Sequence, residues 1–78
     1  MEANVAGAFG AVLRTLRIEK KITQEQLGLE AGLQRKYISL LELGTKAPSL
    51  ATVLRLAKAL NVEPGGLVSL VSAKIDEL

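Results

Sequence analysis

The segment between Thr23 and Gly44 limits the fold most, because it specifies two short helices joined by a tight turn. Thr23-Gln24-Glu25-Gln26 has the capping-box pattern, in which a hydroxyl and an amide side chain satisfy free backbone N–H groups at a helix start. Gly32 is the residue type that best adopts the left-handed conformation at a helix end. A second helix is expected over about residues 34–43, and Gly44 ends it.

Small and apolar residues occupy the positions that allow these two helices to pack closely. Gly28 leaves room for a neighbouring backbone, and Gly32 permits the sharp turn. Five apolar residues have the spacing that locks such a pair together: Leu27, Ala31, Leu33, Ile38 and Leu41. Residues 24–43 therefore predict a helix-turn-helix motif.

Three further helices complete the predicted fold. A first helix is expected over about residues 5–21, a fourth from the Ser49 cap to about residue 60, and a last one over about residues 64–76. The chain has one Phe and one Tyr. Its core must therefore consist mainly of Leu, Val, Ile and Ala, which suits helices better than a sheet. We expect a compact, all-α, five-helix fold.

The composition excludes several classes of function. The chain has no cysteine and no histidine, so disulfides and nearly all zinc, haem and iron–sulfur sites are excluded, and we expect no metal and no cofactor. Because histidine-dependent catalysis is excluded and carboxylates are sparse, we do not expect an enzyme. No apolar run approaches the roughly 18 residues of a membrane span, and no signal peptide is evident, so a cytoplasmic protein is expected. Residues 1–78 fit one domain without a separate catalytic module.

Charge is distributed unevenly along the chain. Residues 14–58 hold nine basic and four acidic residues, a balance of +5, whereas residues 59–78 have a balance of −2. A polyanion would therefore bind the middle of the chain rather than its end.

Several short motifs resemble the phage-repressor/Cro-type (Xre-type) helix-turn-helix family over roughly residues 9–70. The matching segments are Gln24-Glu25-Gln26-Leu27, Ala31-Gly32-Leu33, Tyr37-Ile38-Ser39, Leu41-Glu42, Gly44, Pro48-Ser49-Leu50 and Leu56-Ala57-Lys58-Ala59-Leu60. Two positions depart from the family pattern: Gly28, where Ala is usual, and Gln34, where Ser or Thr often caps the second helix of the motif. The resemblance implies a lambda-repressor-like fold and transcriptional regulation through double-stranded DNA. The short chain and residues 35–39 further resemble the controller proteins of restriction–modification systems.

The second helix of the motif supplies the predicted base-reading residues. A rotation of about 100° per residue places Ile38 and Leu41 on the core side and an opposite face outward. That face contains the predicted base-reading residues Arg35, Lys36, Ser39 and Leu40, and also Leu43. We expect Arg35 to bind a guanine in bidentate fashion, and one interpretation of Leu40 and Leu43 is apolar contact with a thymine methyl. The alternatives are phosphate contacts by the two cations, packing of Leu43 on the following loop, and a merely exposed Leu40.

Phosphate contacts are expected on either side of this face. Gln24 stands at a helix N-terminus, where backbone N–H groups favour an anion, and the resemblance implies a phosphate contact there. Tyr37, Thr45 and Lys46 are further candidates, against the alternative of plain capping or solvation.

A structural ion pair is expected between Arg17 and Glu42. Glu42 is an acid within the predicted DNA-reading segment, and Arg17 lies at the edge of the first helix's apolar arc. The resemblance implies such a pair at these positions.

The two C-terminal helices carry more apolar surface than one small core requires. The fourth helix has an apolar stripe of about 160°, wider than the roughly 100° typical of a helix on one core. We therefore expect a homodimer, with residues 64–76 as its dimerisation element and Leu67, Leu70 and Val71 at the interface. Burial of all these residues within one chain is the alternative.

The leading hypothesis is an autoregulatory transcriptional regulator that binds a pseudo-palindromic operator as a homodimer. RNA polymerase is a further partner if the protein activates transcription. The alternative is an antitoxin-like module that binds another protein and has secondary DNA binding.

Overall fold

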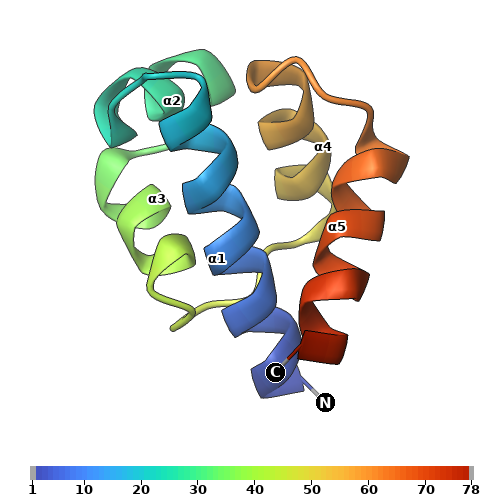
Figure 1. The fold of residues 1–78 in the computed structure, drawn as a ribbon. Coiled ribbons are helices and arrows are strands. Elements are labelled where there is room, and N and C mark those ends of the chain that lie inside the picture. The colour runs from blue at the N-terminus through green and yellow to red at the C-terminus, as the bar shows by residue number, and fades with distance from the viewer. Residues whose placement is uncertain (1, 78) are drawn as a thin grey trace.

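The computed structural model describes residues 2–77, which form five helices and no strand (Figure 1). The helices are α1 (Glu2–Glu19), α2 (Gln24–Ala31), α3 (Arg35–Glu42), α4 (Leu50–Ala59) and α5 (Pro64–Glu77). The all-α, five-helix prediction is therefore confirmed. No helix within residues 2–77 is long and apolar enough to cross a membrane.

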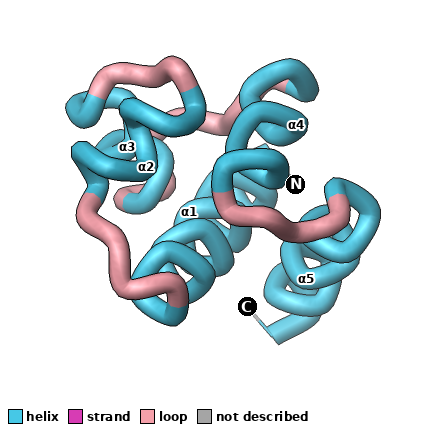
Figure 2. The backbone as a smooth tube through the Cα atoms, turned by 90° about the horizontal axis from the view of Figure 1, so that it is seen from above, coloured by secondary structure: helices cyan, strands magenta, loops and turns pink. Residues whose placement is uncertain are grey.

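Helix α1 occupies the centre of the arrangement. It packs against α3 on one side and against α5 on the other, while α2 packs against α3 and α4 (Figures 1 and 2). The helix-turn-helix and the C-terminal helix therefore lie on opposite sides of α1. This leaves the outer face of α3 open to solvent.

The core consists almost entirely of aliphatic side chains. Its largest fully buried members come from all five helices and the end of α4: Leu13, Leu27, Ile38, Leu41, Leu56, Leu60 and Leu67. Phe9 is the aromatic residue of the buried core cluster. Leu67 therefore holds α5 to the protomer's own core. Its position corrects the expectation that it lies at a dimer interface, because a fully buried side chain offers no surface to a second copy.

The predicted helix signals act as expected at the ends of α2 and α4. The Thr23 hydroxyl accepts a hydrogen bond of 3.0 Å from the Gln26 backbone N–H, and the Gln26 side chain accepts one of 2.8 Å from the Thr23 N–H. Gly32 adopts the left-handed conformation with φ 71°. Ser49 caps α4 by accepting from the backbone N–H of Thr52.

The ends of α1 and α3 show two further features. Gln34 makes no side-chain capping bond at the start of α3, as expected for Gln where Ser or Thr is usual.

The first helix was predicted over residues 5–21, so its predicted start is three residues late and its predicted end two residues late. Lys21 has φ 59°, a left-handed conformation that a helix cannot continue.

Two glycines permit backbone approaches that hold α3 in place. A Cβ atom at Gly28 would lie 2.5 Å from the carbonyl oxygen of Leu33 in the turn. The need for a small residue at Gly28 is confirmed, although its near neighbour is the turn rather than the second helix. A Cβ atom at Gly10 of α1 would overlap the Leu41 carbonyl oxygen and lie 2.8 Å from that of Glu42. Sequence reasoning missed this second approach.

We expect Gly10→Ala to destabilise the protein by about 2 kcal/mol, because the added methyl group forces α1 away from the α3 backbone. Gly7→Ala is the matched control in the same helix, since a Cβ atom there meets nothing within 4 Å. The control should gain up to ~1 kcal/mol from helix propensity. Urea denaturation at one protein concentration measures both values, and equal stability of the two variants would contradict the proposed approach.

Candidate nucleic-acid interface

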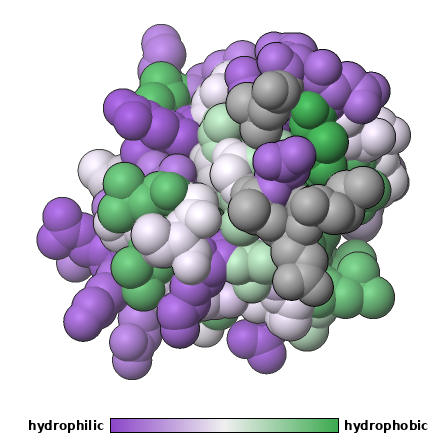
Figure 3. Space-filling model, turned by 90° about the horizontal axis from the view of Figure 1, so that it is seen from below, coloured by the Kyte–Doolittle hydropathy of each residue, from purple (hydrophilic) through white to green (hydrophobic). Residues whose placement is uncertain are grey.

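Helix α3 exposes a cationic face. Ile38 and Leu41 are fully buried beneath the helix, while Arg35 and Lys36 are exposed at its first turn. Viewed from below, the side of the molecule that carries α3 is largely hydrophilic, with hydrophobic side chains among the polar ones (Figure 3). Both cations therefore project away from the protein's own body, as base reading requires. Contact with a base remains a prediction.

The remaining residues of this face are partly or fully accessible. Ser39 and Leu40 are half-buried. Leu43, which directly follows α3, is 72% exposed. The alternative that Leu43 packs beneath the following loop is therefore wrong.

The Glu42 carboxylate joins three helices. It accepts hydrogen bonds from Arg17 Nε at 2.6 Å and from Arg17 Nη2 at 3.0 Å, so the predicted ion pair is present. It also accepts a bond of 3.1 Å from Gln24 Nε2. The Arg17 Nη1 group donates to the carbonyl oxygen of Ile22 at 2.9 Å. We call Arg17, Gln24 and Glu42 the carboxylate cluster.

The carboxylate cluster neutralises the acidic residue of α3. The side chains of Arg17 and Glu42 are only 13% and 5% exposed, so their attraction is weakly screened by solvent. The hydrogen bond to Glu42 raises the pKa of Arg17, while burial acts in the opposite direction. An arginine guanidinium is charged at physiological pH, and the bonded Glu42 favours that charged form. Glu42 therefore presents little repulsion to a polyanion on the outer face of α3.

The four candidate phosphate ligands differ in what their donors already bind. Gln24 is half-buried and uses one amide N–H for Glu42, which leaves the second N–H for another acceptor. Lys46 is exposed. Tyr37 is half-buried and packs against the core, and the phenol hydroxyl is a donor that a phosphate can accept.

Thr45 has both of its donors occupied. Its hydroxyl and its backbone N–H each donate to the carbonyl oxygen of Leu40, at 3.0 and 3.2 Å. Phosphate oxygens at neutral pH act mainly as acceptors and require a donor. The structure thus corresponds to the capping alternative for Thr45 rather than to the expected phosphate contact.

The starts of α2 and α3 lie side by side around one shallow polar hollow. This hollow of about 380 Å³ is lined by Arg17, Thr23, Gln24, Glu25 and Arg35. It brings a predicted phosphate ligand, Gln24, next to the predicted guanine ligand, Arg35. Within residues 2–77, no group of His, Cys, Asp and Glu side chains could hold a metal ion.

We expect Arg17→Met to lower the free energy of unfolding by about 3 kcal/mol, since it leaves the buried Glu42 carboxylate with Gln24 as its remaining donor. The matched control is Lys74→Met, which breaks the exposed Lys74–Glu77 pair and should cost less than about 0.5 kcal/mol. Replacing both partners, in Arg17→Met/Glu42→Leu, should cost less than Arg17→Met alone. Thermal and urea unfolding test these values, and similar losses for Arg17→Met and Lys74→Met would contradict the assignment.

Comparisons with known proteins agree with this geometry. The sequence matches the helix-turn-helix family over residues 13–67. The control protein C.BamHI of Bacillus amyloliquefaciens is 39% identical over 69 residues, which cover 87% of this chain and 85% of that protein. The family match includes the whole of α2 and α3.

Solved structures show the same fold. The restriction-modification controller protein C.AhdI from Aeromonas hydrophila has a TM-score of 0.79 at 41% identity, over 85% of this chain and 94% of that one. The controller protein C.Esp1396I, solved as a tetramer in complex with its natural 35-base-pair operator, has a TM-score of 0.83 at 25% identity, over 91% and 93% of the two chains. The chain therefore belongs to the helix-turn-helix family of DNA-binding transcriptional regulators.

Proposed function

We propose that this protein binds a specific double-stranded DNA operator and regulates transcription by placing α3 in the major groove. The observation that carries this proposal is the exposed cationic face of α3, whose one acid is neutralised by the carboxylate cluster. The major groove of B-DNA admits a single helix, and residues at the start of that helix reach base edges. Nothing in this mechanism requires a catalytic group, and the proposal includes action in the cytoplasm.

Each side chain on this face has a distinct role in the proposal. Arg35 binds a guanine through two parallel hydrogen bonds, and Lys36 binds an adjacent base. Ser39 and Leu40 contact base edges from the next turn. Three further side chains hold the sugar–phosphate backbone: Gln24, Tyr37 and Lys46. Thr45 is left out of this set because its donors are occupied.

The relatives support a narrower role as a restriction–modification controller. C.AhdI is a restriction-modification controller protein, and it shares 41% of its aligned residues with this chain. We include in the proposal that the protein binds near its own promoter, so that its concentration regulates its own synthesis. RNA polymerase becomes a partner where binding activates a promoter.

A homodimer places two copies of α3 on one operator. Four of the seven exposed large hydrophobic residues in residues 2–77 belong to α4 and α5: Leu50, Leu54, Val68 and Leu70. This concentration of apolar surface favours α5 and the adjacent side of α4 as the dimerisation surface. A two-fold axis there would place the recognition helices about 34 Å apart, which fits a pseudo-palindromic site.

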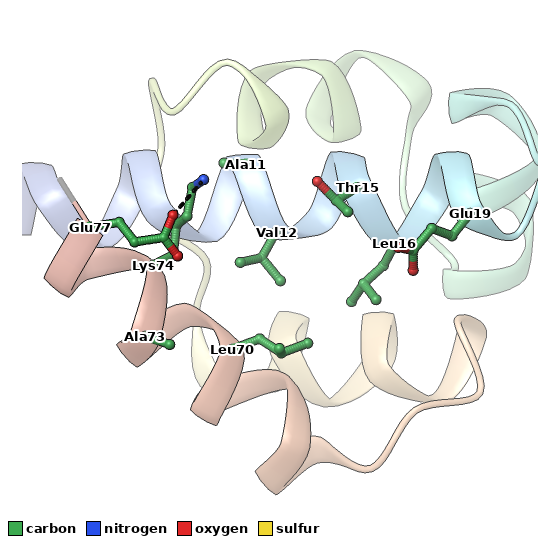
Figure 4. Close-up of a pocket in the computed structure, with 9 residues that line it drawn as sticks. All are labelled: Ala11, Val12, Thr15, Leu16, Glu19, Leu70, Ala73, Lys74 and Glu77. Carbon is green, nitrogen blue, oxygen red and sulfur yellow. Dashed lines mark hydrogen bonds and ion pairs between the residues drawn. The ribbon is translucent and has the colours of Figure 1, made fainter.

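Two of the predicted interface residues, Leu70 and Val71, line grooves beside the buried Leu67 of α5. Leu70 lines a groove of about 300 Å³ between α5 and α1, where Val12 and Leu16 of α1 form much of the apolar wall (Figure 4). Val71 is half-buried in a second groove, of about 270 Å³, which Leu50 and Val68 also line. With Leu67 in the core, the proposed dimer surface contains Leu70, Val71 and Val68.

In vitro selection from a random duplex library tests operator binding directly. We expect an enriched site with two related halves whose centres lie about one helical turn, or a multiple of it, apart. No enrichment, combined with a stable complex with an unrelated protein, would favour the antitoxin-like alternative.

Two variants then separate base reading from phosphate binding. Arg35→Ala should cost about 1–3 kcal/mol on the selected operator and relax specificity at one position of each half-site. Lys46→Ala should weaken all duplexes alike and reduce the slope of log K against log salt by about one per protomer. Binding titrations at several salt concentrations measure both effects, and a sequence-independent loss in Arg35→Ala would refute its base-reading role.

We expect Val68→Asp and Leu70→Asp each to weaken the dimer at least about tenfold, because a dimer would bury a carboxylate in an apolar surface. Leu29→Asp is the control, since Leu29 is 79% exposed on α2, away from α5. Analytical ultracentrifugation over a concentration series measures the association. If both α5 variants associate like the wild type, α5 is not the interface.

A further inference from the structure

Leu43 points in the same direction as the base-reading residues of α3. It is the C-terminal cap of the helix, and its backbone is still helical, with φ −77° and ψ −9°. Seven residues are almost two helical turns, so Leu43 lies within about 20° of Lys36 around the helix axis. The buried Ile38 and Leu41 lie on the opposite side. Leu43 therefore occupies the middle of the outward face.

The surroundings of Leu43 fit DNA better than an apolar protein partner. A single exposed leucine needs no special explanation, but this one is 72% exposed within a cationic surface. The exposed cations Arg35, Lys36 and Lys46 lie on α3 and in the loop that follows it. The acid of this segment, Glu42, is held by Arg17 and Gln24. The ligand of this face must therefore combine negative charge with an apolar group.

Thymine in a duplex offers that combination. Its 5-methyl group is the apolar group that the base edges present in the major groove, beside an anionic backbone. Resting on the function proposed above, we propose that Leu43 is a specificity-determining residue that contacts a thymine methyl at the C-terminal end of α3. A rise of 1.5 Å per residue puts Leu43 about 10 Å from Lys36 along the helix axis. At about 3.4 Å per base pair along the duplex axis this equals about three steps, and because the groove runs obliquely to that axis, the contacted thymine lies at most about three steps away.

The test replaces thymine by uracil, which removes the methyl group and nothing else, at each position of the selected operator. We expect uracil at one position in each half-site, at most about three base pairs from the base bound by Lys36, to weaken wild-type binding about fourfold, as for one buried methyl group. In Leu43→Ala, the difference between thymine and uracil at that position should disappear. Its exposure predicts that this variant folds normally, and circular dichroism with a thermal melt checks this.

Two matched variants make the result specific. Leu29→Ala also truncates a strongly exposed leucine and should keep the full response to uracil. Leu40→Ala should lose the response only at a different position, because Leu40 lies about one helical turn before Leu43.

Each contrary result has a distinct meaning. If Leu43→Ala keeps the wild-type difference between thymine and uracil operators, whether or not it weakens both, the methyl contact is overturned. A selected operator that is insensitive to uracil at every position would overturn this inference and the Leu40 methyl contact, but not operator binding. Failure to select any operator would overturn the proposed function together with it.

Discussion

The hydrogen bonds to the Glu42 carboxylate fix α1, α2 and α3 relative to one another. A carboxylate has about four acceptor sites on its two oxygens, and three of them are used here by donors from α1 and α2. The same contacts that neutralise the acid therefore also fix the orientation of α3 relative to its neighbours. A neutral residue at this position would remove the repulsion of a polyanion but would lose the link between the helices. A buried acid with matched donors supplies both effects.

Steric constraints act at both ends of α3 beside this electrostatic link. Gly28 allows the turn before α3 to lie against α2, and Gly10 allows α1 to approach the carbonyl groups at the C-terminal end of α3. Close backbone contacts at both ends of α3 fix its position better than a contact at one end would. The carboxylate cluster then sets the rotation of α3 about its own axis, because Glu42 can reach Arg17 in only one orientation. The outward direction of Arg35, Lys36 and Leu43 follows from these constraints.

The local signals in the sequence were sufficient for most of the fold. Thr23, Gly32 and Ser49 determine helix ends through their own backbone and side-chain chemistry, so they could be interpreted without tertiary information. The partner of Glu42 was also predicted, from the position of Arg17 on its helix and from the family resemblance. Gln24 as a third member of the cluster was missed, because its place at a helix N-terminus pointed to a phosphate and no local signal indicated a bond to Glu42. Leu67, Leu70 and Val71 all lie on the apolar part of α5, and helical periodicity alone did not show which of them faces the core. The approach at Gly10 and the occupied donors of Thr45 likewise depend on distances between segments.

The central place of α1 has a consequence for the evolution of operator sites. Because α3 and α5 lie on opposite flanks of this one rigid helix, the proposed reading surface and the proposed dimer axis are a fixed width apart. Adding one base pair between two half-sites rotates one of them by about 35° around the duplex, given 10–10.5 base pairs per turn. A rigid dimer cannot follow such a rotation, because α3 and α5 both pack directly on α1. Related proteins with this architecture could therefore change the bases that they recognise through single substitutions on α3, whereas the spacing of their half-sites should change much more slowly.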